Sequence, residues 1–180
     1  MTIAYCTVAP SSATAQDAPR FEVAGAYRLA LIRQEFDWQD YQGWAIEADA
    51  YIRPQLAIAT AVDRVRWSRT FNQFIGESHR EYGFLAGVKA VSDPERSIMR
   101  FVQIMAGLTY FSSTLHTLPD LEITNYEFVI QPGVGVERRM GRHVSIRASL
   151  DARLGDLRYV QSWQYPEWRF GAGVVYRLNR

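Results

Sequence analysis

The stretch EWRFGAGVVYRL, residues 167–178, alternates between two kinds of side chain along its whole length. Every second position is apolar, with aromatic residues near both ends: Trp168, Phe170, Ala172, Val174, Tyr176 and Leu178. The positions between them are mostly small or charged. Successive side chains of a β-strand point to opposite faces, so this period of two predicts a strand with one apolar face. A soluble sheet makes the same alternation, so the rest of the chain must decide where that face lies.

Seven further segments show the same period, and no helical period of comparable length competes with it. They span residues 21–36, 43–52, 56–67, 82–90, 99–112, 126–139 and 144–154. In the third segment the alternation changes phase near Arg64, because Val65 and Trp67 have the wrong parity, and we expect a β-bulge there. The sequence therefore predicts eight strands.

The connections between these segments alternate in length. Three are short and turn-like, at residues 53–55, 92–97 and 140–143, and four are longer, at about 37–42, 68–81, 113–125 and 158–166. Short periplasmic turns and longer extracellular loops are typical of an outer-membrane barrel. Eight strands enclose an interior barely wide enough for side chains. We therefore expect an all-β, antiparallel, up-and-down transmembrane β-barrel with a polar, side-chain-filled lumen and no open pore.

The face opposite the apolar one carries acids and bases in similar number, which suits mutual pairing inside a closed lumen. Lys89 is the only lysine, and arginine suits such a lumen because its planar fork binds two carboxylate oxygens at once. The expected lumen network comprises Glu22, Arg28, Glu47, Asp49, Asp63, Lys89, Glu137, Arg147, Asp151, Arg153, Arg169 and Arg177. Glycines on the same face are expected to leave room for these side chains: Gly83, Gly87, Gly107, Gly133, Gly135, Gly171 and Gly173.

Aromatic residues near the segment ends predict the girdles that flank the apolar band of a membrane barrel. They are Tyr27, Trp44, Tyr51, Tyr82, Tyr110, Tyr126, Trp168 and Tyr176. A soluble lipocalin-like barrel is the alternative, with apolar side chains inside and charges outside. The interior of eight strands would hold so many large apolar side chains only with difficulty, which favours the membrane barrel.

The eight alternating segments and the terminal FGAGVVYRL, residues 170–178, resemble the small eight-stranded outer-membrane β-barrels of Gram-negative bacteria, the OmpA/OmpX-like porin family group. The resemblance covers about residues 20–180. It implies a place in the bacterial outer membrane, among its lipids and lipopolysaccharide. It also implies recognition by the barrel-assembly machinery, which usually reads an aromatic residue at the end of the last strand. Here Tyr176 and Leu178 would serve that role.

Composition narrows the remaining functions. Lys and Arg total 20 against 19 for Asp and Glu, which argues against a nucleic-acid surface. Cys6 is the only cysteine and the three histidines are not spaced as metal ligands, so we expect no metal and no cofactor. Residues 1–15, ending in the small-x-small pattern Ala13-Thr14-Ala15, are expected to be the remnant of an export signal, and residues 16–180 the barrel.

An enzyme is the other alternative, because a few barrels of this family modify lipid A with a His, a Ser and an acid near the outer rim. His143 and Ser145 have a suitable spacing, but they lie at a turn predicted to be periplasmic, whereas lipid A occupies the outer leaflet. His79 and His116 fall in predicted loops, where such residues are common by default. We therefore expect no catalytic activity.

The predicted function is a structural or interaction role in the cell envelope, including that of an accessory subunit in a larger envelope complex. The long loop expected at residues 113–125 is more apolar than a free loop requires. It could pack on a partner protein, on lipopolysaccharide or over the mouth of the barrel itself. The residues expected to make this contact are Leu115, Leu118, Leu121 and Ile123.

Overall fold

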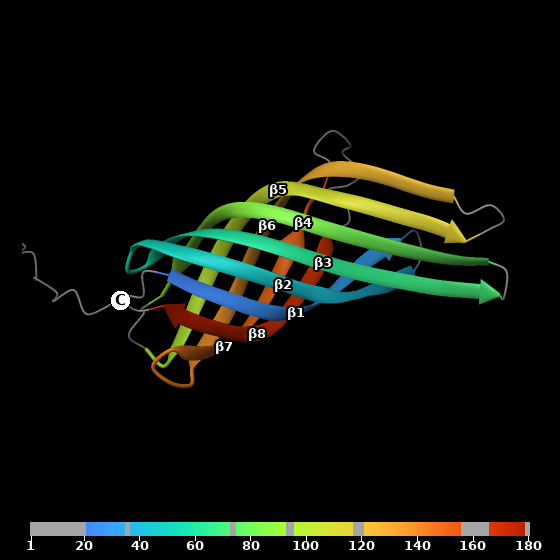
Figure 1. The fold of residues 1–180 in the computed structure, drawn as a ribbon. Helices are drawn as coiled ribbons and strands as arrows, with labels where there is room; N and C mark the ends of the chain where they lie inside the picture. The colour runs from blue at the N-terminus through green and yellow to red at the C-terminus, as the bar shows by residue number, and fades with distance from the viewer. Residues whose placement is uncertain are drawn as a thin grey trace, which may run out of the picture.

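Eight strands follow one another around a closed antiparallel barrel in the computed structural model (Figure 1). The structure describes residues 21–34, 37–72, 75–92, 96–116, 121–155 and 166–178. The strands are β1 Phe21–Gln34, β2 Asp37–Arg53, β3 Leu56–Asn72, β4 Ile75–Val91, β5 Ile98–His116, β6 Leu121–Arg139, β7 Val144–Arg153 and β8 Glu167–Leu178. Within these ranges, no helix is long and apolar enough to span a membrane. The signal remnant expected at residues 1–15 lies outside the described residues.

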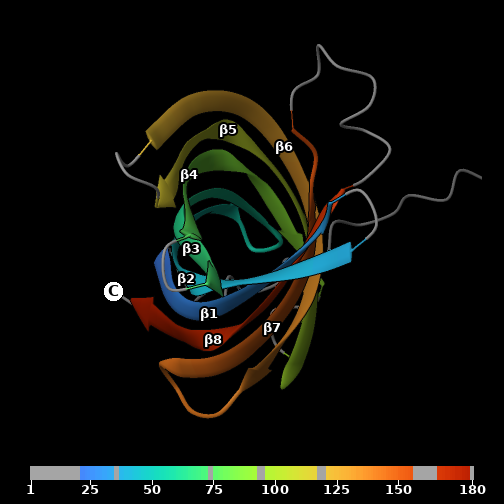
Figure 2. The same cartoon turned by 90° about the vertical axis from the view of Figure 1, so that its right-hand side faces the viewer.

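The stretch at residues 167–178 closes the barrel. It forms β8, which pairs with β7 on one side and with β1 on the other, in a register that runs from Phe21↔Leu178 to Leu31↔Trp168. Viewed at 90° to the first picture, β1 lies between β2 and β8 (Figure 2). Both lateral edges of the first and last strands are therefore hydrogen-bonded over this length, as a membrane barrel requires.

The two faces of the barrel wall have opposite character. In β8, Phe170 and Val174 are 44% and 52% exposed on the outside, whereas Arg169 and Arg177 are 0% and 2% exposed on the inside. The same division holds around the wall, where exposed valines, isoleucines and phenylalanines cover the outer face. A soluble barrel would bury these apolar side chains and expose the charges, so the lipocalin-like alternative is wrong. The fold is a transmembrane barrel.

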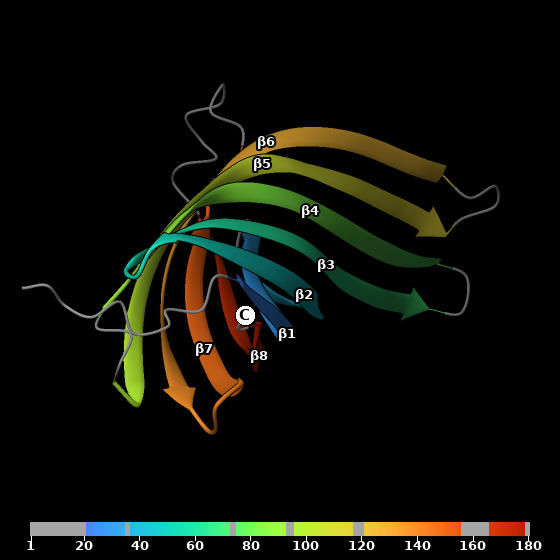
Figure 3. The same ribbon diagram turned by 60° about the vertical axis from the view of Figure 1, so that its left-hand side comes forward.

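Strands β3 to β6 run well beyond the ends of β1, β7 and β8 and form a curved sheet that projects from the barrel (Figure 3). The loops expected at residues 37–42, 68–81 and 113–125 are mostly strand in the structure. We call the part of β3–β6 that lies beyond Arg64, Tyr82, Tyr110 and Tyr126 the extension. It escaped the sequence pattern because its outer face is polar, so the apolar alternation that marks a membrane strand stops where the extension begins.

The bulge expected near Arg64 is absent. The pairing of β3 with β2 and with β4 continues through Arg64 without a shift of register. Val65 nevertheless faces inward, where it is fully buried in an apolar cluster with Ala30 and Tyr41, against which Trp67 packs. The alternation only seems to change phase. Beyond Arg64 the outer face becomes polar and the inner face becomes apolar, while each side chain keeps its side of the strand.

Glycines of the inner face serve two purposes. At Gly83, Gly133 and Gly171, a Cβ atom would meet a charged or polar side chain of the lumen, as predicted. At Gly107, by contrast, it would lie 2.0 Å from the backbone carbonyl oxygen of Phe84 on the neighbouring strand. Gly87 and Gly173 show the same backbone conflict. These glycines therefore allow neighbouring strands to coil closely in a narrow barrel, which the sequence pattern did not reveal.

Replacing Gly107 by alanine is expected to lower the free energy of unfolding by about 1–3 kcal/mol, the usual range for overpacking. The obstructing atom is backbone and can move only with its strand. Gly25→Ala is the matched control, because a Cβ at this outward position has nothing within 4 Å. Urea unfolding of the barrel in phospholipid vesicles measures both variants, and equal midpoints for the two would contradict the expectation.

Candidate functional site: the charged lumen

The structure places all twelve residues of the expected lumen network on the inner face of the wall, each at most 6% exposed. Charged groups so deeply buried need partners, because an unpaired charge in the interior is strongly disfavoured. Ion pairs supply them around the whole lumen. The structure adds Glu81, which is fully buried and which the sequence assigned to a loop.

Arg147 of β7 is the centre of a first group of charges near the short turns, which we call the turn-side cluster. Its guanidinium lies 2.8 Å from Glu47, 3.2 Å from Asp49, 3.1 Å from Glu137 and 3.5 Å from Glu22. These four carboxylates come from β1, β2 and β6. One planar cation thus ties together strands on both sides of β7, which the five N–H donors of arginine make possible.

Three further cations complete the turn-side cluster. Arg177 donates to Glu22 at 2.8 Å and also pairs with Glu137. Lys89 lies 2.6 Å from Asp49, with its ammonium over the ring of Phe101. The turn-side cluster is completed by Arg28, which pairs with Glu47 and lies 2.5 Å from Asp151.

A second group of charges, the hairpin-side cluster, lies nearer the extension. It consists of Asp63, Glu81, Arg153, Glu167 and Arg169. Arg153 lies 2.5 Å from Asp63 and also pairs with Glu81, while Arg169 lies 3.0 Å from Asp63 and 2.5 Å from Glu81. Asp63 and Glu81 are therefore each bound by both cations, and Arg169 also lies 2.6 Å from Glu167.

The pairs of the hairpin-side cluster cross the lumen. Arg153 stands on β7 and Asp63 on β3, which are four strands apart in a closed ring of eight. Arg169 on β8 and Glu81 on β4 are likewise four strands apart. A direct ion pair between opposite walls fills the section of the barrel between them. These contacts explain how the lumen is filled by side chains.

One side of the lumen is apolar. Ala59 and Ala61 of β3 pack with Leu85, Met105 and Val129 of the next three strands in a buried cluster on the inner face. Leu85, Met105 and Val129 interrupt the alternation of their segments, and the sequence pattern did not place them in the lumen. The charges are thus concentrated on the wall formed by β7, β8, β1 and β2, and they reach across toward this apolar side.

The outer aromatic residues are aligned by the strand register. Successive neighbours Tyr27, Trp44, Arg64, Tyr82, Tyr110 and Tyr126 occupy one continuous row across six strands. The rings of Tyr110 and Tyr126 lie 5.0 Å apart, and Arg64 lies over the ring of Tyr82. On β3–β6 this row borders the polar outer face of the extension, which is where an interfacial girdle belongs. Trp168 and Tyr176 are also on the outer face.

Tyr51 does not belong to the girdle. Its side chain turns inward, and its hydroxyl donates a hydrogen bond of 3.0 Å to Glu22. The position near a strand end predicted an interfacial role. However, Tyr51 is an even number of residues from Glu47 and Asp49 along β2, so it points into the lumen with them and joins the turn-side cluster. This spacing is the sequence signal that distinguishes a lumen residue from a girdle residue.

The apolar residues expected to make a loop contact lie partly in strands. Leu115 and Leu121 stand opposite each other in β5 and β6, and Ile123 of β6 is 61% exposed. Leu118 lies outside the described residues. The segment is therefore mainly the end of a β-hairpin in the extension.

His79 and His143, the two histidines whose side chains the structure describes, do not form a common site. His143 stacks on Tyr176 at the short turn, whereas Ser145 is buried inside the barrel, so the two do not form a pair. His79 and Ser113 face each other across β4 and β5, with His79 Nδ1 2.6 Å from Ser113 Oγ. In the part of the chain that the structure describes, no group of His, Cys, Asp and Glu side chains is arranged to hold a metal ion.

Comparison with solved structures identifies the architecture. Ail, the attachment invasion locus protein of Yersinia pestis, superposes with a TM-score of 0.68 at 11% identity, over 88% of this chain and 97% of Ail. Neisserial surface protein A gives a TM-score of 0.69 at 13% identity, over 88% of this chain and 97% of that protein. This chain has the fold of the small outer-membrane β-barrels.

The N-terminal β-barrel domain of Pseudomonas aeruginosa OprF agrees with this architecture, with a TM-score of 0.51 at 16% identity over 86% of this chain and 97% of that domain. No protein-family model and no curated protein sequence matches the chain. At such low identities the likeness establishes the fold, and the function must be argued from the residues of this chain.

Proposed function

We propose that the protein is an integral barrel of the bacterial outer membrane that has no open pore and acts as a structural or interaction protein of the cell envelope. The observation that carries the proposal is the pair of contacts Arg153–Asp63 and Arg169–Glu81, which join opposite walls of the lumen. Together with the apolar outer face, these contacts favour a barrel that anchors a surface rather than one that conducts solutes.

The extension supplies a surface for an interaction role. It carries exposed polar side chains such as Arg66 and Arg80 on its outer face, while Ile123 is exposed on its inner face, opposite Ser113. Strands that continue beyond the girdle project into water on the side of the long hairpins, which is extracellular in this architecture. A partner protein or lipopolysaccharide would meet the barrel here. Ail is named as an attachment protein, so a barrel of this fold can serve as an interaction protein.

The proposal is tested by expressing the full chain in a Gram-negative host. We expect it in the outer-membrane fraction, with faster gel migration before heating than after heating, and no sustained ion conductance in planar bilayers. A protein that stays soluble without detergent would contradict the membrane location, and a steady conductance would contradict the filled lumen.

The proposal includes no catalytic step. The contact between His79 and Ser113 brings a base to a hydroxyl, as in acyl-transfer enzymes, and is the specific reason to test for lipid-A modification. Mass spectrometry of lipid A from the same cells is expected to show unchanged acyl chains. Loss or gain of an acyl chain that is abolished by Ser113→Ala would establish an enzyme instead.

A further inference from the structure

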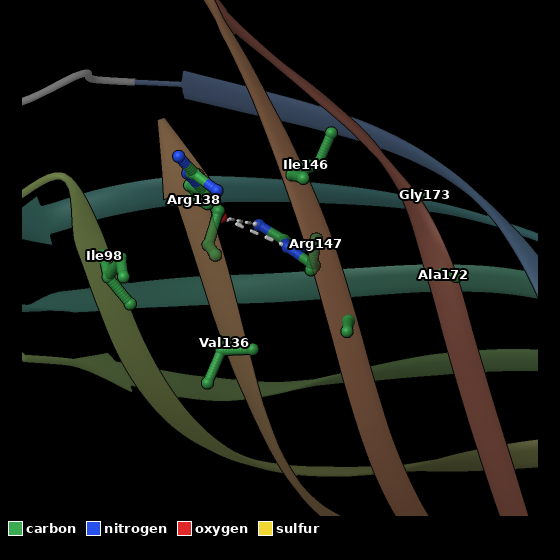
Figure 4. A pocket seen from close by; sticks show the side chains of 9 residues that line it. Ile98, Val136, Arg138, Ile146, Arg147, Ala172 and Gly173 are labelled. Carbon is green, nitrogen blue, oxygen red and sulfur yellow. Dashed lines mark hydrogen bonds and ion pairs between the residues drawn. The ribbon is translucent and has the colours of Figure 1, made fainter. Parts of the chain in front are cut away.

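The outer wall has a groove on the lipid-facing side of β5–β8, near the short turns. Its volume is about 510 Å³, and most of its lining is apolar. The outward side chains that form it are Ile98, Val136, Arg138, Ile146, Ala148 and Ala172. Figure 4 shows Ile98, Val136 and Ile146 on three successive strands, with Arg138 toward the end of β6.

Small residues make this groove. Ala148 of β7 and Ala172 of β8 stand opposite each other, with larger pairs on either side of them: Ile146 with Val174, and Leu150 with Phe170. Two methyl groups between bulkier neighbours leave a depression in an otherwise even apolar surface. Because its floor is apolar and it faces the bilayer, a hydrocarbon chain fits it chemically.

A second hollow adjoins the groove and is polar. It measures about 600 Å³ and is lined by Ser92, Arg96, Ser97, Ile98 and Arg100. Ile98 borders both hollows, so the apolar groove and the polar hollow are neighbours. Across the β5–β6 pair, Ile98 stands opposite Arg138 and Arg100 stands opposite Val136, which makes the two arginines diagonal neighbours.

Among the described residues, Arg100 and Arg138 have no counter-ion. Both are exposed, and neither guanidinium makes an ion pair with another described residue. Glu137 also borders the groove, but it turns into the lumen, where Arg147 and Arg177 bind it. Dashed lines start from the labelled Arg147 in Figure 4. Two neighbouring cations at the end of an apolar groove call for a ligand with an anionic head and an apolar tail.

We infer that this wall binds an anionic phospholipid. One acyl chain lies over Ala148 and Ala172, and the phosphate is bound by Arg100 and Arg138. The short-turn end is periplasmic in this architecture, so the lipid belongs to the periplasmic leaflet. The inference rests on the proposed membrane location and adds a defined lipid site to it.

The test uses the full-length barrel in detergent, incubated with equal amounts of phosphatidylglycerol and phosphatidylcholine that carry the same acyl chains. Native mass spectrometry counts the lipids retained. We expect phosphatidylglycerol to be preferred, and the preference to fall in Arg100→Gln/Arg138→Gln by about five-fold per arginine, since each basic group near a lipid surface contributes about 1 kcal/mol. Ala148→Leu fills the groove and is expected to reduce retention of both lipids.

Arg53→Gln is the matched control, because Arg53 is an exposed arginine at the end of β2, outside the lining of both hollows. Equal retention of the two lipids by the unmodified barrel would overturn the inference. It would also be overturned if Arg100→Gln/Arg138→Gln and Ala148→Leu retained as much phosphatidylglycerol as Arg53→Gln. Heat-dependent gel migration is recorded for every sample. Failure of the unmodified barrel to fold in detergent would count against the proposed membrane barrel, whereas a folded barrel without lipid preference would count against this site alone.

Discussion

Replacing Arg153 and Arg169 together by methionine is expected to prevent the barrel from reaching its folded form. Both cations bind the carboxylates of Asp63 and Glu81, and no other described cation contacts either one. A buried charge that loses its partner destabilises a protein by about 3–5 kcal/mol. Two such losses approach the whole stability of a typical domain, about 5–15 kcal/mol. The folded fraction after dilution from urea into vesicles, read from unheated gels, measures the effect.

The control for this variant also removes the charges of Asp63 and Glu81, the two carboxylates that both cations bind. Adding Asp63→Asn and Glu81→Gln leaves neutral groups in place of the four ionised ones, and folding is expected to recover substantially. Neutral replacement of a complete buried ion pair is often well tolerated, whereas removal of one partner is not. If the double variant folds as well as the unmodified barrel, or the quadruple variant no better than the double, the charge balance of the hairpin-side cluster does not control folding.

Arg147→Met is expected to lower the free energy of unfolding by about 3–5 kcal/mol. The substitution keeps much of the side-chain length but withdraws the one cation shared by Glu22, Glu47, Asp49 and Glu137. These acids keep Arg28, Lys89 and Arg177 as partners, so the barrel should still fold, but with an excess of buried negative charge. Urea unfolding in vesicles measures the loss.

Two further variants separate charge from geometry at Arg147. Arg147→Lys restores the charge without the planar fork of the guanidinium. Its free energy of unfolding is expected to lie between those of Arg147→Met and the unmodified barrel, because a lysine cannot contact four carboxylates at once. Arg66→Met is the exposed control in the extension and is expected to stay within about 0.5 kcal/mol of the unmodified barrel. An Arg147→Met midpoint equal to that of Arg66→Met would contradict the central role of Arg147.

The architecture was predictable because the bilayer imposes a simple rule on every strand. Val174 must face lipid and Arg177 must face the lumen, so a period of two repeats in all eight segments and assigns the inner charges correctly. The partners of each charge were not predictable. That Arg153 meets Asp63 depends on the strand order and on the shear of the closed barrel, and no local sequence pattern records either.

The extension was missed for a related reason. Outside the bilayer, the outer face of a strand contacts water, so Arg66 and Arg80 replace the apolar residues that mark a membrane strand. On the inner face of the same stretch, Val65 and Tyr41 form an apolar cluster instead of a charged one. The alternation of apolar residues therefore looks shifted by one position. Glu81 was assigned to a loop because it lies in this stretch. Backbone hydrogen bonds to neighbouring strands hold these segments, and such bonds leave little trace in the sequence.

The seam between β1 and β8 also bears on how the chain folds. Phe21 and Leu178 are paired although they stand at opposite ends of the described sequence, so this ladder closes the longest loop in the molecule. Hairpins such as β5–β6 involve near neighbours in sequence and are entropically easier to form. Closure of the ring is therefore expected to be the late, slow event of folding. Until then, the first and last strands expose open edges that can pair with the wrong chain.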